Sequence, residues 1–396
     1  MERRPVIVIG SGPAGTASAL FLHARDPGLA RETLLLEKAH HPRPKVCAGG
    51  LIPHTLTCLH ELDVPLAVPN VPVRRARVDV PGATVSYDED CELCRVVRRD
   101  EFDHSLVRAC AARGVEVREG EKVIELRREA DGVRIETDRG SYHARVLIGA
   151  DGSGSLVRRR LVDDDRGRVG RAVMADVPIA ACTWDGVAQG RYEFRFTAVP
   201  EGLRGYAWAF PCLIGGAPHV NIGVYSVHTD GTGALLGRLL EAEVARVGAV
   251  DATVKSFPIR WYGRGSRLAT PHVLLAGDAA GVDPLMGEGI SFAFEYGRRA
   301  AAAAAAALAS GDFAFDEYAR QVAGTWMGQK LRRLGLGVRL FYGPAWRPFF
   351  ALAAHSRGLQ HVGIRWFNGV DGWDRRSAWA LVGAWLWGPP RPVAAP

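Results

Sequence analysis

The hydrophobic pattern at the N-terminus changes its period twice within the first 36 residues. Residues 6–9 form a β-branched apolar run that ends at Gly10, and residues 14–25 contain mostly good helix formers. A second apolar run follows at residues 33–36. This order predicts a strand, a glycine turn, a helix and a second strand, which is the beginning of a βαβ unit.

Alternating patterns dominate the middle of the chain. A helix is predicted at residues 106–113, and the following residues 114–145 alternate apolar and polar positions between turn signals. This alternation is typical of a three-stranded antiparallel meander, and a buried strand is predicted after it at residues 146–149. Residues 168–262 stay strand-like and rich in aromatic side chains. We therefore expect a second, antiparallel subdomain there.

The pattern returns to strand, glycine-rich turn and helix after residue 272. Residues 273–276 are apolar, Gly277 opens the turn, and the helical segment that follows includes an uninterrupted alanine run at residues 300–307. Because alanine is the best helix former, this run predicts an ordered helix and not a linker.

Composition indicates a soluble globular protein with two subdomains. The 396 residues are 47% hydrophobic and 23% charged, which excludes a wholly disordered chain and a membrane bundle. The seven cysteines are an odd number without a secretory signal, so we expect reduced thiols in a cytoplasmic protein. The first residues resemble a signal peptide, but Ser11, Gly12 and Pro13 interrupt the apolar run.

Positive charge is concentrated at the C-terminus. The net charge is +7, and residues 326–396 contain ten Lys and Arg against only Asp371 and Asp374, a local excess of +8. The same residues hold seven of the ten tryptophans. This composition suits peripheral contact with the headgroup boundary of an anionic membrane. It equally suits a helical cap packed on the rest of the protein. We expect no nucleic-acid partner.

A glycine motif lies at the first predicted turn. Gly10-Ser11-Gly12-Pro13-Ala14-Gly15 has the form G-x-G-x-x-G between a strand and a helix. Such glycines permit a tight turn, close approach of the backbone to a pyrophosphate and close packing of helix on strand, while the helix N-terminus supplies partial positive charge. Glu37 ends the second strand 22 residues after Gly15, where a carboxylate binds ribose hydroxyls. The motif predicts a dinucleotide, either NAD or FAD.

Later segments favour FAD. Asp278 lies at the turn after the apolar run of residues 273–276, one residue beyond Gly277, where its carboxylate can bind a ribityl hydroxyl. Gly287-Glu288-Gly289 can bring backbone N–H groups against the pyrimidine edge of a flavin. Arg99 lies at the start of a helix, where its guanidinium can meet the pyrophosphate.

Several motifs together resemble a known fold. They are the glycine string, Arg99-x-x-Phe102-Asp103-x-x-Leu106, Ala150-Asp151-Gly152 and Gly277-Asp278-Ala279, and the set is similar to the FAD-dependent monooxygenase and reductase fold typified by para-hydroxybenzoate hydroxylase. The resemblance covers about residues 6–309. Within it, KVCAGGL (residues 45–51) and PEGLRGYAWAFP (residues 200–211) resemble the geranylgeranyl reductase family.

The second of these segments is similar to the family motif P-x-x-x-G-Y-x-W-x-F-P, and the matching residues are Gly205, Tyr206, Trp208, Phe210 and Pro211. Ala48 follows the cysteine at the position where the family often has glycine. The resemblance implies an α/β fold: a Rossmann-like FAD-binding domain, a second antiparallel-sheet substrate domain and a helical C-terminal region. We assign residues 1–73, 95–165 and 266–325 to the first, 74–94 and 166–265 to the second, and 326–396 to the third.

The resemblance also implies FAD-dependent saturation of isolated carbon–carbon double bonds in a polyprenyl chain. Reduced flavin N5 delivers a hydride to one alkene carbon, and a proton must reach the other. The predicted catalytic residues are Cys47, Tyr206 and Trp208. We expect Cys47 at the flavin face, where a thiol can donate or relay that proton, or simply fill space.

The predicted binding residues form two sets. The cofactor-binding set is Gly10, Gly12, Pro13, Ala14, Gly15, Glu37, Lys38, Cys47, Ala48, Gly49, Arg99, Val123, Asp278, Gly287, Gly289 and Ile290. The substrate-binding set is Gly50, Leu51, Tyr206, Trp208, Phe210 and Pro211. Alternation along a strand puts the rings of Tyr206, Trp208 and Phe210 on one face, which can wall an isoprenoid tunnel; ordinary core packing is the alternative.

Alternatives stay open for the reaction and its partners. The substrate is a prenylated small molecule or lipid, and the electron donor is NAD(P)H or a redox partner such as reduced ferredoxin. A monooxygenase or halogenase on the same fold is the second interpretation, although halogenases have W-x-W-x-I-P where this chain has Tyr206 and Phe210. A flavoprotein without its own organic substrate is the third. Cys91-x-x-Cys94 lacks a second pair or a histidine at zinc spacing, so we predict no metal site.

Overall fold

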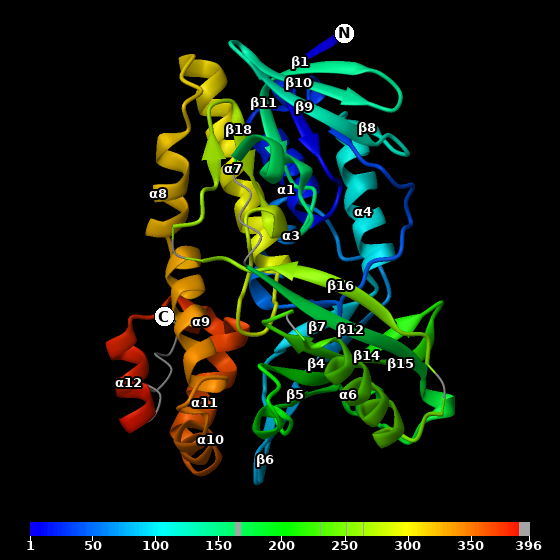
Figure 1. Ribbon diagram of the computed structural model, residues 1–396, viewed down its shortest axis with the longest axis vertical. Coiled ribbons are helices and arrows are strands. Elements are labelled where there is room, and N and C mark those ends of the chain that lie inside the picture. Colours follow the sequence, from blue (N-terminus) through cyan, green and yellow to red (C-terminus); the bar gives the residue numbers. More distant parts are fainter. Residues whose placement is uncertain (163–167, 230, 251, 264, 388–396) are drawn as a thin grey trace, which may run out of the picture.

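A computed structural model describes residues 1–162, 168–229, 231–250, 252–263 and 265–387 (Figure 1). These residues form two large sheets, a small third sheet and a set of C-terminal helices. The fold is therefore the α/β arrangement that the sequence predicts, with a Rossmann-like part, a largely antiparallel sheet and a helical C-terminal region.

The first sheet contains the predicted βαβ unit. Its strands run in the order β17-β18-β11-β1-β2-β8, and a hairpin of β9 and β10 adds to the edge of β11. The bounds are β1 (Glu2–Ile9), β2 (Leu34–Leu36), β8 (Glu116–Arg118), β9 (Val123–Glu129), β10 (Gly132–Thr137), β11 (Ser141–Gly149), β17 (Ala269–Thr270) and β18 (Val273–Leu275). The pairings β18–β11, β11–β1, β1–β2 and β2–β8 are parallel. Helices cover such a sheet, so its strands are continuous apolar runs.

The meander differs in one respect from the prediction. The strand at residues 116–118 joins the parallel sheet beside β2, and the antiparallel strands are β9, β10 and the first half of β11. The predicted buried strand is the second half of that same β11. One edge of β11 pairs with β10 over residues 141–144 and with β18 over residues 147–149, so a single strand serves both arrangements.

Helices pack against this first sheet. They are α1 (Pro13–Arg25), α2 (Pro27–Arg31), α3 (Pro53–Glu61), α4 (Arg99–Ala112), α7 (Ile290–Ser310) and α8 (Asp316–Gly324), with short turns η1 (Arg158–Val162) and η4 (Gly277–Ala279). The alanine run of α7 is an ordered helix, and Ala300, Ala304 and Ala307 of its inner face are buried. α4 begins at Arg99, where the sequence predicts a helix start, and it continues through the helical segment predicted from residue 106.

The second sheet has two chemically different faces. Its order is β16-β12-β15-β14-β13-β5-β6, and only the β13–β5 pair is parallel within it. The bounds are β5 (Arg75–Val80), β6 (Ala83–Asp88), β12 (Val169–Pro178), β13 (Arg191–Arg195), β14 (Gly205–Ile214), β15 (Ala217–Ser226) and β16 (Lys255–Arg260). Along β14, Ala207 and Ala209 belong to a core under α6 (Gly233–Arg246), whereas Tyr206, Trp208 and Phe210 belong to the core shared with the first sheet.

A small third sheet contacts β14 of the second sheet. It consists of β3 (Gly50–Leu51), β7 (Cys94–Val97) and β4 (Asn70–Val73). Short elements complete the second sheet: α5 (Gly186–Gln189), η2 (Ile179–Ala181) and η3 (Val199–Glu201). The domain boundaries given above stay predictions, and the one between residues 165 and 166 lies outside the described residues.

Residues 326–387 are largely helical and pack along the second sheet (Figure 1, orange to red). They form α9 (Trp326–Phe341), α10 (Trp346–His355), α11 (Arg357–Asn368), η5 (Val370–Arg375) and α12 (Ala378–Trp387). The rings of Phe341 and Phe350 pack at tilted angles against the ring of Phe196, which follows β13. Across the described ranges, no helix combines the length and the hydropathy that crossing a bilayer requires.

Candidate functional site

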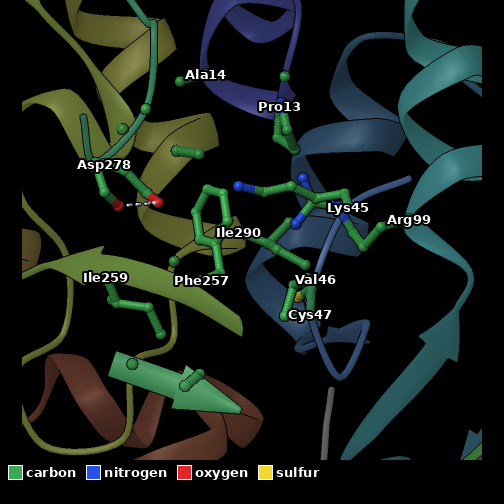
Figure 2. A pocket seen from close by; sticks show the side chains of 18 of the residues that line it. Pro13, Ala14, Lys45, Val46, Cys47, Arg99, Phe257, Ile259, Asp278 and Ile290 are labelled. Carbon is green, nitrogen blue, oxygen red and sulfur yellow. Dashed lines mark hydrogen bonds between the residues drawn. The ribbon is translucent and has the colours of Figure 1, made fainter. Parts of the chain in front are cut away.

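A cavity of about 930 Å³ is lined by residues of both large sheets. The β1–α1 turn, the end of β2 and residues 277–290 line it from the first sheet, and β12–β15 line it from the second. Residues 43–50 and the first turn of α4 close one side, while α11 contributes Phe367 and Asn368. Figure 2 shows side chains from these separate segments converging on one space.

Most of the predicted site residues line this cavity. They are Gly10, Gly12, Pro13, Ala14, Glu37, Lys38, Cys47, Ala48, Gly49, Gly50, Arg99, Val123, Tyr206, Trp208, Phe210, Asp278, Gly287, Gly289 and Ile290. The structure places Gly15, Leu51 and Pro211 away from the cavity wall. A Cβ on Gly15 would overlap the Gly10 carbonyl oxygen, so this glycine serves the packing of the turn. Leu51 is fully buried in β3, and Pro211 is paired with Val220 of β15.

The glycine turn presents a helix N-terminus to the cavity. Gly10 has φ +98°, a conformation that favours glycine, and a Cβ there would collide with the Ala150 carbonyl. Pro13 begins α1, and no side chain caps the first N–H groups of this helix. Free N–H groups with partial positive charge form an anion site, so the turn fits a diphosphate.

Glu37 is fixed to the same turn. Its carboxylate accepts hydrogen bonds from the Ser11 N–H (3.0 Å), the Ser11 hydroxyl (2.8 Å) and the Ala39 N–H (3.1 Å). Burial opposes ionisation, but the Arg43 guanidinium and these donors hold the pKa of Glu37 below its usual value. The cavity wall therefore carries an ionised carboxylate directly after β2, a group able to accept hydrogen bonds from hydroxyls.

Arg99 lines the cavity and is paired with a neighbouring carboxylate, and its contact with a pyrophosphate stays a prediction. Its Nε and Nη2 donate to the two carboxylate oxygens of Asp103 at 2.8 and 3.0 Å, and both side chains are buried. Although burial opposes the charged form, Asp103 raises the pKa of Arg99. The i, i+4 spacing of Arg99 and Asp103 on α4 is the sequence signal for this pair.

Arg43 is a cation that the sequence reasoning missed. Its Nε is buried without a hydrogen-bond partner among the described residues. Its Nη2 lies 3.6 Å from Glu37 Oε2 and 3.7 Å from Asp103 Oδ2, too far for good hydrogen bonds. A largely buried guanidinium with spare donors at the glycine turn suits the anionic part of a dinucleotide.

Lys45 is a second missed residue, and it points across the cavity (Figure 2). Its Nζ lies 3.3 Å from the centre of the Phe257 ring. Burial lowers the pKa of Lys45 to about 8, and the attraction of Asp278 opposes this effect while Arg99 adds to it. The cavity therefore carries a cation that titrates near neutral pH.

Cys47 lies in a tight loop on the cavity wall. The Gly49 N–H donates to Cys47 Sγ at 3.4 Å, and Gly49 has φ +81° beside the Val97 carbonyl. A Cβ on Gly50 would stand 3.3 Å from the Phe210 ring. The glycine pair thus lets the loop turn sharply and lets Phe210 approach it closely.

The aromatic face of β14 forms the opposite wall. The Tyr206 hydroxyl donates to the Met286 carbonyl at 2.5 Å, and the Trp208 Nε1–H donates to Asn221 Oδ1 at 2.8 Å. Burial raises the pKa of Tyr206 well above its usual value. Rings from neighbouring strands extend this wall, and sequence reasoning did not find them; they are Tyr192, Phe194, Tyr225 and Phe257.

The turn before α7 supplies the remaining polar groups. Asp278 Oδ2 accepts a hydrogen bond from the Ser153 hydroxyl at 3.0 Å, drawn as the dashed line in Figure 2. Gly287 has φ +71°, and Gly289 precedes Ile290, the first residue of α7. The start of α7 therefore also directs backbone N–H groups toward the cavity.

The two cysteines of the C-x-x-C pair differ in solvent exposure. Cys94 is buried and lines the cavity, whereas Cys91 is half-buried. Burial raises the pKa of both thiols. Both are free, and protonated thiols are poor metal ligands.

Comparison with known proteins agrees with this geometry. A family model described as FAD binding domain matches residues 3–209. Digeranylgeranylglycerophospholipid reductase 1 of Methanopyrus kandleri is 30% identical over 337 residues, which cover 78% of this chain and 82% of that protein. The chain belongs to the geranylgeranyl reductase-like family of FAD-binding proteins. The menaquinone reductase of Mycolicibacterium smegmatis is also 30% identical, over 327 residues and 76% of each chain.

Solved structures share the fold. A geranylgeranyl bacteriochlorophyll reductase-like protein from Thermoplasma acidophilum has a TM-score of 0.68 and 21% identity, covering 92% of this chain and 99% of that one. A flavin-dependent brominase has a TM-score of 0.71 and 18% identity, covering 94% and 96%. The protein is thus an FAD-dependent oxidoreductase, and the fold alone is common to reductases and halogenases.

Proposed function

We propose that this oxidoreductase saturates isolated carbon–carbon double bonds of a polyprenyl chain. The observation that carries the proposal is the continuous wall of aromatic rings, headed by Tyr206, Trp208 and Phe210, in the same cavity as the glycine turn. An apolar wall beside a dinucleotide site suits a long hydrocarbon substrate. Two of the similar proteins bear names that specify geranylgeranyl groups.

The chain's own residues divide the task of binding the cofactor. The α1 N-terminus and Arg43 suit the diphosphate, and Glu37 suits a ribose hydroxyl. Asp278 and the backbone of residues 287–290 suit the ribityl and ring portions. When bound and reduced, FAD supplies a hydride from its N5.

Cys47 is the proposed proton donor to the second alkene carbon. Its thiol lines the cavity and is half-buried, so it reaches the substrate space while little water surrounds it. We expect Cys47→Ser to slow product formation and to change the pattern of partly reduced products. Unchanged turnover and product pattern in this variant would leave the thiol only a space-filling role.

Tyr206 and Trp208 are proposed to hold the alkene in place. Both ring systems are fixed by hydrogen bonds to Met286 and Asn221, so their faces are oriented before substrate binds. Gly50 leaves room for the chain beside Phe210. The electron donor is proposed to be NAD(P)H or reduced ferredoxin, in a cytoplasmic setting with a prenylated small molecule or lipid as substrate.

An anaerobic turnover experiment tests the reaction class. The flavin is reduced chemically without oxygen, and the protein is incubated with geranylgeranyl diphosphate, a prenyl quinone or a diprenyl glycerol lipid. Mass spectrometry should show two added hydrogens per reduced double bond. Flavin-free protein is the control, and no mass gain with any of these substrates would overturn the proposal.

A monooxygenase or halogenase activity is the second candidate, since a brominase has the same fold. Such an enzyme requires oxygen and adds an oxygen or halogen atom to an organic substrate. Turnover under labelled oxygen with bromide or chloride present separates these functions: a monooxygenase adds labelled oxygen to the product, a halogenase adds a halogen, and a reductase adds only hydrogen. The outer positions of the halogenase motif W-x-W-x-I-P are Tyr206 and Phe210 here, which favours the reductase.

A further inference from the structure

The last helix, α12, is apolar along its whole length and largely exposed. Its sequence AWALVGAWLW contains no charged or hydroxyl side chain. Trp379 is 83% exposed, Leu386 58% and Trp387 87%, and Val382 is exposed beside them. Ala384 is its only buried residue. A helix that is apolar all round belongs in a protein core or a membrane and is unusual on a water-facing surface.

One side of α12 is attached to the rest of the protein. The Trp385 Nε1–H donates to the Ser356 hydroxyl at 2.8 Å. Ala384 packs with Val362 of α11 and Trp373 of η5 in a small separate core. The helix is therefore held in a defined position with its other sides turned outward, rather than extending freely from the chain.

Positive charge stands at both ends of this apolar helix. Arg375 and Arg376 precede its first residue, and their neighbouring Asp374 is neutralised by the buried Lys330 at 2.9 Å. At the other end, the backbone of Gly358 packs against the Trp385 carbonyl. This contact places the exposed Arg357 beside the last turn, and no acidic side chain pairs with it in the described part of the chain.

We propose that α12 docks this protein on the surface of an anionic lipid bilayer and lies in the plane of the headgroups. Tryptophan is favoured at that depth, and the exposed Arg357 can reach the phosphates while the helix enters the acyl boundary. Arg375 and Arg376 lie over the Trp326 and Trp373 rings and add positive charge near the other end of the helix. A second copy of the chain is the competing occupant. It is disfavoured because it would bring the arginines of two copies together.

Docking would place the lipid phase close to the active-site cavity. α11 contacts α12 at Gly358 and reaches the cavity wall at Phe367 and Asn368. Nine residues of α-helix span about 14 Å at 1.5 Å per residue. A prenyl lipid would therefore travel only a short distance from the bilayer to the aromatic wall. This last step rests on the proposed function, whereas the docking does not.

Vesicle flotation with the full-length flavoprotein tests the docking. The two vesicle types are phosphatidylcholine alone and phosphatidylcholine with phosphatidylglycerol. We expect binding to the anionic vesicles to be at least about tenfold tighter. The double variant Trp379→Ser/Trp387→Ser should bind both types of vesicle with an affinity at least about tenfold lower. Arg357→Gln should lower the affinity for anionic vesicles only.

The matched control replaces two exposed apolar residues elsewhere. Val250→Ser/Val254→Ser removes side chains that are also exposed, and it should bind vesicles as the native protein does. Equal flavin content shows that each variant is folded. Absence of binding by the native protein, or unchanged binding by the tryptophan variant, would overturn the proposal. So would a concentration-dependent dimer that the tryptophan variant abolishes, because α12 would then be a self-association surface.

The outcome is separable from that of the proposed reaction. Reduction of dissolved geranylgeranyl diphosphate without vesicle binding would refute the docking and support the reductase. Vesicle binding without reduction of any prenyl compound would support the docking and refute the reductase.

Discussion

Replacing Gly223 by alanine should displace the Trp208 indole from its place in the cavity wall. Trp208 and Gly223 are directly paired across β14 and β15. A Cβ on Gly223 would lie 2.5 Å or less from three ring atoms of Trp208. Ordinary carbon–carbon contacts are about 3.5–4.0 Å, so the indole must retreat by at least about 1 Å, and the open side is the cavity.

The expected cost has two parts. Forcing a methyl group into a packed site costs about 1–3 kcal/mol. Moving the indole also weakens its 2.8 Å hydrogen bond to Asn221, and a buried acceptor without its donor costs about 1–3 kcal/mol. We expect Gly223→Ala to lower the free energy of unfolding by about 2–4 kcal/mol. Trp208→Phe should cost a similar amount, because it removes the same hydrogen bond and leaves a void.

The double variant is the decisive measurement. A phenylalanine ring is shorter than the indole and has no atoms at the outer positions Cζ2 and Cη2, which lie nearest to the new methyl group, so that methyl group fits beside it. Trp208→Phe/Gly223→Ala should therefore be about as stable as Trp208→Phe alone, a coupling of about 2 kcal/mol or more. Urea unfolding followed by far-ultraviolet circular dichroism gives the four free energies.

A second glycine provides the matched control. Gly237 lies on α6 with nothing near its missing Cβ, so Gly237→Ala should be neutral or stabilising. Two results would show that the indole does not lie across Gly223. One is a loss of less than about 0.5 kcal/mol in the free energy of unfolding of Gly223→Ala, and the other is additive losses for Gly223→Ala and Trp208→Phe.

Three further predictions concern buried charges. Lys330→Met leaves Asp374 buried without its partner and should cost about 3–5 kcal/mol in urea unfolding, whereas Lys330→Met/Asp374→Leu should recover most of the loss; equal costs would refute the buried-pair explanation. Burial lowers the pKa of Lys45 to about 8 from an ordinary 10.5, so the charged amine destabilises the flavin-free fold below pH 8. The free energy of unfolding should rise by at most about 3 kcal/mol between pH 8 and 10.5, and a pH series on Lys45→Met should lack this rise. Despite burial, the hydrogen bond from His54 and two nearby guanidiniums lower the pKa of Glu295 to about 2. Glu295→Gln should therefore cost about 3 kcal/mol at pH 7, and this difference should disappear as the pH falls from 4.5 to 2; a difference that persists at pH 2 would contradict the assignment.

The sequence by itself determined the elements whose signals lie within a few consecutive residues. The glycine string, the apolar runs around it and the position of Glu37 were sufficient for the βαβ unit, because turn conformation and strand burial are local properties. The period of two along β14 was likewise sufficient to place Tyr206, Trp208 and Phe210 on one face.

Only the tertiary structure decided which distant groups meet these elements. Arg43 and Phe257 belong to none of the motifs, and Lys45 begins KVCAGGL without any signal that its amine enters the cavity; these residues line one cavity although they come from separate segments of the chain. The exposure of α12 could not be read from its composition, since an apolar helix is equally suited to a core. Periodicity in the sequence specifies which face of a helix or strand is apolar. Long-range packing decides which element that face meets, and this neighbour sets the charge states and contacts of the side chains between them.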